Sequence, residues 1–137
     1  MTINTQPNTK PCHCGSNKRY DLCCGPYLNG IKKPTTAKAL MKSRFTAYVF
    51  NDEEYLKKTW HPFSLPASLD LHKDKTQWQQ LKILGSKKGK AIDKKGWVAF
   101  AAFYIDEKGT HGVLKEESLF VREAGQWLYH SGTQIED

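Results

Sequence analysis

Long hydrophobic runs, an export signal and cysteines outside one short segment are all missing from this sequence of 137 residues. The longest apolar run, Trp97–Ile105, is too short to cross a bilayer. The N-terminal residues form neither a basic segment nor an apolar one, so no secretory signal is recognisable. We therefore expect a protein without a membrane span, located in the cytoplasm.

The length suits one domain with a small appendage and excludes a large multidomain enzyme. Hydrophobic residues make up 39% and aromatic residues 12% of the chain, which is enough for a folded core and excludes wholesale disorder. The formal net charge of +7 favours attraction to acidic partners or nucleic acid, but says nothing about the fold.

The four cysteines are Cys12, Cys14, Cys23 and Cys24, and no cysteine follows them. Cysteines that staple a secreted fold would be spread along it, so a tight cluster in a chain without a signal indicates a metal site. Four thiolates complete a tetrahedral zinc shell of the structural kind. Two disulfides or redox-active thiols are the alternative interpretation of the same cluster.

The cysteines belong to the segment Pro11-Cys-His-Cys-Gly-Ser-Asn-Lys-Arg-Tyr-Asp-Leu-Cys-Cys-Gly25. It resembles the SEC-C motif, usually Pro-Cys-x-Cys-Gly-Ser-Gly-Lys-x-Tyr-x-x-Cys-Cys-Gly. The resemblance implies zinc bound by all four cysteines. In the preprotein translocase ATPase, the same knuckle docks a chaperone and the ribosome. Asn17 replaces the usual glycine, and asparagine tolerates a left-handed backbone, so the turn should persist.

Two helices are expected before the strands. Apolar residues recur with helical spacing from Ala37 to Tyr48, after Thr35 or Thr36 as a candidate N-cap. A second helix is expected to start at Asn51 and to end before Pro62.

Strand patterns follow in the second half of the chain. Residues 63–75 are expected to be loop and Thr76–Gln80 a short helical turn, with strands at Leu81–Leu84, Trp97–Ile105, Val113–Val121 and Trp127–His130. Both alternating sets of side chains in Trp97–Ile105 are apolar, which predicts a strand covered on both faces. The order predicts an α+β domain with helices on one face of an antiparallel meander.

Residues 34–132 resemble the middle domain of the YchJ-like bacterial proteins. The matching segments are Ala39–Tyr48, Tyr55–Leu56, Thr59–Pro62, Glu116–Glu123 and Trp127–Tyr129. The resemblance implies a cone-shaped, nuclear-transport-factor-2-like (cystatin-like) fold, which hosts both enzymes and binding modules. The expected division is a flexible tail at 1–10, the knuckle at 11–25, a linker at 26–33 and the cone-shaped domain at 34–137.

Arg44 lies within the apolar stripe of the first predicted helix, where a buried guanidinium requires acceptors. Glu116 and Ser118 share one face of a predicted strand, so we expect Arg44 to approach Glu116 inside the domain. Tyr48, Trp60 and His61 could line the same cavity. Either His61 or Glu116 would serve as general base in a ligand pocket, or the charges form a buried ion pair among core aromatics.

The segment Ser86–Gly96 holds the densest positive charge, from Lys87, Lys88, Lys90, Lys94 and Lys95. No aromatic residue is interleaved before Trp97, whereas proteins that bind single strands combine basic grooves with stacking rings. The segment is therefore interpreted as a solvated hairpin, with electrostatic docking to RNA, ribosome or an acidic chaperone as the alternative.

Three functions are compatible with these features. The first is a zinc-binding adaptor whose knuckle recruits a protein or ribosomal partner. The second is a small pocket enzyme, a hydro-lyase or isomerase, although no nucleophile-and-base arrangement, phosphate loop or dinucleotide motif is visible. The third is a basic RNA-binding module. A homodimer is compatible with all three, because open sheet faces in this architecture often pair.

Overall fold

The computed structural model describes residues 9–136. The predicted tail at 1–10 lies almost entirely outside these residues. Two short helices, η1 (Tyr20–Leu22) and α2 (Gly25–Leu28), belong to the N-terminal segment, so part of the expected linker is helical. The helices α3 (Ala37–Val49) and α4 (Glu53–Lys58) and the 3-10 turn η2 (Leu71–Lys73) precede four strands. No helix in the described part of the chain is long and apolar enough to span a membrane.

Helix α3 begins where the sequence predicts, because the side chain of Thr36 accepts a hydrogen bond from the Ala39 amide at 3.1 Å. The start of α4 differs from the prediction. Asn51 adopts a left-handed turn with φ of 56°, and Asp52 becomes the N-cap by accepting from the Tyr55 amide. The helix ends at Lys58, before the predicted His61-Pro62 boundary.

The strands β1 (Gln77–Lys88), β2 (Lys95–Ile105), β3 (His111–Glu123) and β4 (Gln126–Gln134) form an antiparallel meander in the order β1-β2-β3-β4. The predicted helical turn at Thr76–Gln80 is wrong, because β1 pairs with the far end of β2 from Gln77 onward. This pairing is accompanied by ring contacts of Trp78 with Phe45 and Tyr48. Tertiary packing therefore extends a strand whose local sequence is polar.

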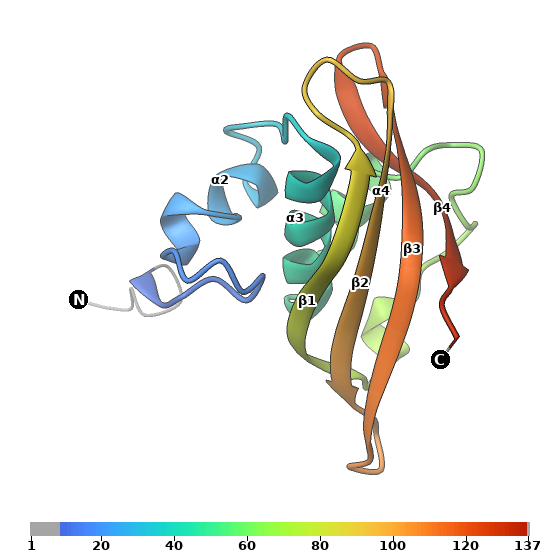
Figure 1. The fold of residues 1–137 in the computed structure, drawn as a ribbon. Helices are drawn as coiled ribbons and strands as arrows, with labels where there is room; N and C mark the ends of the chain where they lie inside the picture. The colour runs from blue at the N-terminus through green and yellow to red at the C-terminus, as the bar shows by residue number, and fades with distance from the viewer. Residues whose placement is uncertain (1–8, 137) are drawn as a thin grey trace.

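Helix α3 lies along one face of the curved sheet, and the N-terminal segment lies on the other side of α3 (Figure 1). The main core fills the space between α3 and the sheet. It contains Ala37, Leu40, Met41, Phe45, Leu81, Val98, Phe100, Ala102, Phe120 and Trp127. A smaller cluster around Ala47, Tyr55, Leu56 and Leu71 joins α3 to α4 and η2. The observed α+β architecture confirms the predicted fold class.

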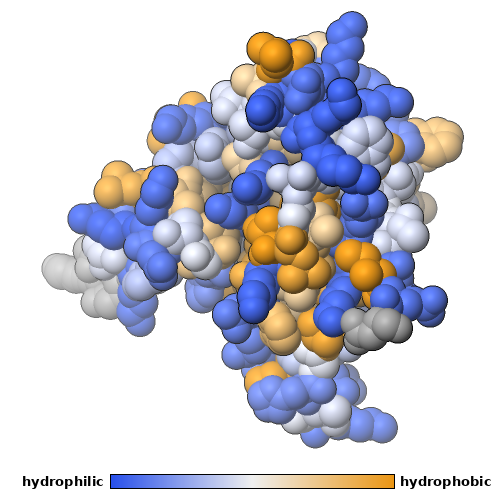
Figure 2. Space-filling model, in the orientation of Figure 1, coloured by the Kyte–Doolittle hydropathy of each residue, from blue (hydrophilic) through white to orange (hydrophobic). Residues whose placement is uncertain are grey.

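In the described part of the chain, residues 9–136, no helix covers the opposite face of the sheet, so the prediction that β2 is covered on both faces is wrong. Phe103 is 37% exposed, Leu84 50% and Val113 42%. Apolar side chains gather over the strands in Figure 2. Ala101 is nevertheless only 2% exposed. Small and aromatic side chains on this face pack against one another and bury part of their apolar surface. The strand can therefore be apolar on both faces although no helix packs on this one.

Candidate functional site

The first cysteine pair is held by a tight backbone loop. The Cys12 amide donates to the Lys18 carbonyl at 2.8 Å, and the Gly15 amide donates to the Cys12 carbonyl at 3.3 Å. Gly15 and Asn17 both have positive φ, 88° and 66°. Asparagine at position 17 thus adopts the left-handed conformation that the sequence predicts.

The second cysteine pair lies between η1 and α2. The Cys23 amide donates to the Tyr20 carbonyl, and Cys24 is the N-cap of α2. Gly25 packs directly against Tyr20, where a Cβ atom would lie 2.9 Å from the carbonyl oxygen. A side chain at position 25, directly after the second cysteine pair, would therefore collide with Tyr20.

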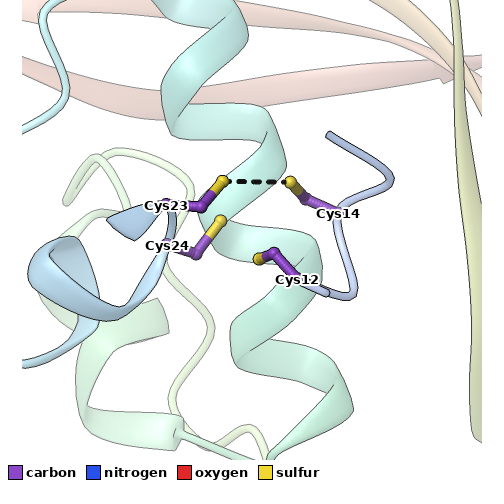
Figure 3. A group of neighbouring side chains, drawn as sticks. All are labelled: Cys12, Cys14, Cys23 and Cys24. Carbon is purple, nitrogen blue, oxygen red and sulfur yellow. Dashed lines mark hydrogen bonds between the residues drawn. The ribbon is translucent and has the colours of Figure 1, made fainter. Parts of the chain in front are cut away.

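The four predicted metal ligands are brought together (Figure 3). All four Sγ atoms lie within 4.8 Å of one another, and the Sγ atoms of Cys14 and Cys23 are 3.6 Å apart. All four are free thiols rather than disulfides, and Cys12, Cys14 and Cys24 are buried. Tetrahedral zinc–sulfur bonds of about 2.3 Å hold sulfurs roughly 3.8 Å apart, so the donor set fits a zinc ion.

The raised pKa values of two of the thiols also favour a bound cation. Hydrogen bonds with Cys12 and Cys14, followed by burial, raise the pKa of the Cys24 thiol. Hydrogen bonding with Cys12 likewise raises the pKa of Cys14 to about 11, whereas hydrogen bonds from Cys14 and Cys24 lower the pKa of Cys12. Crowding and burial therefore disfavour the thiolate forms of Cys14 and Cys24, and a divalent metal would supply the positive charge that favours them.

The knuckle, residues 11–25, is fastened to α3. The Cys12 Sγ lies 3.7 Å from the Thr46 hydroxyl, and the rings of His13 and Tyr20 make edge contacts with Phe50. His13 is exposed and its contact is with this ring. The knuckle is thus part of the packed structure, and its position depends on the C-terminal half of α3.

A groove of about 320 Å³ runs between the knuckle and the N-terminal half of α3. Its walls include Cys23, Cys24 and four lysines: Lys18, Lys32, Lys38 and Lys42. Leu22 lies at the same groove and is 69% exposed. We call this feature the basic groove. It combines positive charge with one apolar anchor beside the cysteines, and the sequence did not reveal it because its residues come from three separate segments.

Arg44 is buried, at 4% exposure, and lines the same inner cavity as Glu116, as expected, but the alternative of an ion pair between them is wrong: none joins them within residues 9–136. Its Nη1 donates to the Leu56 carbonyl at 3.0 Å and to the Thr59 hydroxyl at 2.7 Å. Burial lowers the pKa of Arg44, yet guanidinium stays charged at neutral pH. The carbonyl of Leu56 in α4 and the hydroxyl of its C-cap Thr59 therefore take the place of a carboxylate.

Aromatic rings complete the surroundings of the guanidinium. Its central carbon lies 4.8 Å from the ring centroids of both Trp60 and Tyr129. Residues 59–61 pair with Tyr129 of β4: the Tyr129 amide donates to the Thr59 carbonyl and the His61 amide to the Tyr129 carbonyl. This short parallel bridge positions both rings at once.

An inner cavity of about 200 Å³ lies between α3 and the sheet. Five of the six predicted pocket residues line it: Arg44, Tyr48, Trp60, Glu116 and Ser118. The sixth, His61, lies outside it and pairs with the exposed Glu123 at 2.9 Å. The general-base role suggested for His61 toward this cavity is therefore not compatible with its position.

Sequence reasoning missed Trp78 and Tyr129, which also line the cavity. Tyr129 lies two residues after the buried Trp127 on β4, in the regular part of the β3–β4 pairing, so strand alternation places both side chains on the same inward face. Trp78 lies in a segment that was predicted to be a helical turn. A longer strand prediction would have placed Trp78 in the sheet. The two-residue spacing of Trp127 and Tyr129 within the predicted strand Trp127–His130 is the signal that could have found Tyr129.

The five lysines of the predicted basic hairpin lie where the sequence predicts, at the β1–β2 turn and its flanks. Lys87 is 3.8 Å from Glu117 and its side chain is 70% exposed. Its ammonium also lies 5.8 Å from the centroid of the Trp97 ring. The remaining four, Lys88, Lys90, Lys94 and Lys95, are exposed as well. The structure thus agrees with a solvated hairpin.

Comparisons with known proteins identify the domain. The sequence model of the family described as "YchJ, middle NTF2-like domain" matches residues 36–132. A UPF0225 protein of Streptomyces avermitilis is 39% identical over 132 residues, which cover 96% of this chain and 90% of the relative. The UPF0225 protein YchJ of Shigella dysenteriae is 41% identical over 127 residues, which cover 90% and 82%.

Two solved structures are also similar. The solution structure of a SEC-C motif containing protein from Rhodopseudomonas palustris is 30% identical, with a TM-score of 0.79, over 91% of this chain and 98% of that one. The crystal structure of a SEC-C motif containing protein from Psychrobacter arcticus has a TM-score of 0.68 at 25% identity, over 94% and 84% of the two chains. With its cysteine cluster and its NTF2-like domain, this chain belongs to the YchJ-like family.

Proposed function

We propose that this protein is a zinc-binding adaptor of the cytoplasm, whose knuckle and basic groove dock an acidic segment of a partner protein. Cys12, Cys14, Cys23 and Cys24 would hold the ion. A zinc ion with four thiolates has a formal charge of about −2 and acts structurally, because the closed shell leaves no open position for chemistry. The metal would therefore shape the docking surface and take no part in a reaction.

One observation supports docking beside the cysteines: four lysines and the exposed Leu22 converge on the basic groove. Positive charge steers an acidic partner toward the surface, and an apolar anchor in a groove supplies contact area. The SEC-C motif of the similar structures agrees with a metal-bound knuckle here. The lysine-rich hairpin packs against the N-terminus of α3, where the Ala37 amide donates to the Gly89 carbonyl, but none of its lysines lines the groove, so it serves as the comparison.

The experiment is capture of partners from lysate on the zinc-loaded protein, with paired charge reversals. Lys38→Glu with Lys42→Glu alters the basic groove, and Lys87→Glu with Lys90→Glu makes the same change of charge at the hairpin. We expect the groove variant and the metal-stripped protein to lose a protein that the hairpin variant retains. Equal loss from both double variants would refute docking at the groove.

A nuclease arm separates protein from RNA. Capture through the groove should survive ribonuclease and should weaken as salt rises, because the lysines act through screened charge. If ribonuclease removes the captured material, or if only the hairpin variant loses it, the basic RNA-binding alternative replaces the adaptor.

A further inference from the structure

The inner cavity contains a carboxylate whose charge is not paired. The Oε2 atom of Glu116 accepts a hydrogen bond from the Ser118 hydroxyl at 2.8 Å and a longer one from the Tyr129 hydroxyl at 3.5 Å. Within residues 9–136, no basic side chain forms an ion pair with it. Two neutral donors on one oxygen hold the carboxylate in place, and they leave its negative charge available to a ligand.

The protein makes room for this carboxylate. Gly132 of β4 lies opposite Ser118, and a Cβ atom there would overlap the Glu116 carboxyl group and lie 2.9 Å from the Tyr129 hydroxyl. Glycine weakens a strand, so its presence here reflects the close approach of another group. The carboxylate is thus accommodated by the backbone and does not merely occupy a leftover space.

The other charge at the cavity, Arg44, is already engaged. Two oxygens accept from its Nη1 atom, and the rings of Trp60 and Tyr129 lie against the guanidinium. Tyr129 lies between the two charges, with its ring on Arg44 and its hydroxyl toward Glu116. Burial, followed by the charge of Glu116, raises the pKa of Tyr129 to about 12, so this separator remains neutral.

The walls of the cavity are aromatic and apolar. Tyr48, Trp78 and Tyr129 contribute aromatic rings to the lining, and Met41, Phe45, Phe100 and Leu114 supply the apolar remainder. Electron-rich ring faces attract cations, and aromatic walls with a carboxylate are a means of binding ammonium groups. A volume of about 200 Å³ suits a single ring or a short alkyl chain, since a cavity of roughly 150 Å³ accepts benzene.

We infer that the inner cavity binds a small organic ammonium ion, with its nitrogen at Glu116 and its apolar body against the aromatic walls. This inference is independent of the adaptor function, because the cavity and the basic groove lie on opposite sides of α3.

The test compares three probes of one shape: benzylamine, benzyl alcohol and benzoate, titrated calorimetrically into the zinc-loaded full chain at neutral pH. We expect benzylamine to bind best and benzoate to show no binding. Benzoate binding as tight as benzylamine would assign the cavity to Arg44 and to anions, and would overturn the proposal. Failure of all three probes to bind would overturn it as well.

Two variants at the site and one matched control assign the binding to the carboxylate. Glu116→Gln keeps the shape of the side chain and removes its charge. It should lower the affinity for benzylamine about tenfold or more, as expected for loss of a hydrogen bond to a charged group. Gly132→Ala keeps the charge of Glu116 but displaces its carboxyl group, and should also lower the affinity for benzylamine. Glu117→Gln, on the outer face of the same strand, should bind like the wild type.

Benzylamine affinity that is unchanged in both Glu116→Gln and Gly132→Ala would contradict the inference. Circular dichroism and thermal unfolding show whether each variant is folded. If Glu116→Gln does not fold, Gly132→Ala alone decides the outcome.

Discussion

The Sγ atom of Cys12 lies 3.7 Å from the hydroxyl oxygen of Thr46, which is fully buried in α3. The same hydroxyl lies 3.3 Å from the Lys42 carbonyl, and its single proton is donated either to that carbonyl or, when Cys12 is a thiolate, to the sulfur. One helix therefore supports both the inner cavity and the cysteine cluster, from opposite faces. Groups that hydrogen-bond a ligand sulfur orient it and tune the metal, so Thr46 has a direct effect on the site.

Replacing Thr46 by valine removes the hydroxyl and keeps the shape. We expect zinc affinity to fall about tenfold, the lower end of the range for such supporting groups, while the fold is retained. Competition with a chromophoric chelator measures this change. Thr110→Val, at the exposed β2–β3 turn, is the control, and equal affinity in the two variants would show that Thr46 has no role.

Metal removal should affect the knuckle and the adjoining end of α3 before the sheet. Chelation would leave four crowded thiols without a cation, and α2 and the Phe50 contacts depend on their arrangement. Hydrogen exchange should increase at Gly25–Leu28 and around Ala47, and remain slow at Val98 and Phe100. Uniform protection after complete zinc loss would contradict this coupling.

Zinc stoichiometry should depend on cysteine and not on histidine. The double variant Cys12→Ser with Cys14→Ser should lose bound zinc, whereas His13→Ala should retain about one ion per chain, because His13 is exposed and packs on Phe50. Elemental analysis of the purified proteins measures both. Loss of zinc from His13→Ala would make the histidine a ligand.

Arg44→Lys should destabilise the domain by about 2–4 kcal/mol, because an ammonium cannot stack on two rings or keep the same pair of acceptors. Urea unfolding measures the free energy. Arg19→Lys is the matched control, since Arg19 pairs with Asp21 on the surface and its side chain is 54% exposed. Similar losses in both variants would mean that the enclosed geometry of Arg44 contributes nothing.

Tyr55 predicts a pH dependence on the alkaline side. Burial raises its pKa to about 12, from 10 for an ordinary phenol. A raised pKa means that the folded state holds the proton more tightly, so this stabilisation is complete below pH 10 and is lost as pH rises toward 12. The loss should reach about 2–3 kcal/mol, one tyrosine's share of the alkaline decline.

Comparing Tyr55→Phe with the wild type isolates this contribution, because lysines that titrate in the same range are common to both. The variant should be less stable near pH 8, where it lacks the hydrogen bond to Ser43, and should lose less stability above pH 10. Parallel stability curves for the two proteins would contradict the assignment.

The sequence by itself determined the cysteine cluster, the start of α3 just after the candidate caps Thr35 and Thr36, and the order of α3, α4 and the four strands. These features depend on residues close together in the chain: a spaced motif, a capping side chain and a local periodicity. The left-handed Asn17 belongs to the same class, because the backbone conformation of a tight turn is set within a few residues.

Only the tertiary structure decided the partners of Arg44, the open face of β2 and the basic groove. The acceptors of Arg44 come from Leu56 in α4 and from its C-cap Thr59, and the bridge between Trp60 and Tyr129 brings both rings to the guanidinium. Such contacts join segments that are distant in sequence, and burial alone says that a charge needs acceptors without saying which. The single short cysteine segment therefore indicated a metal site, whereas the surface beside it became visible only once the chain was folded.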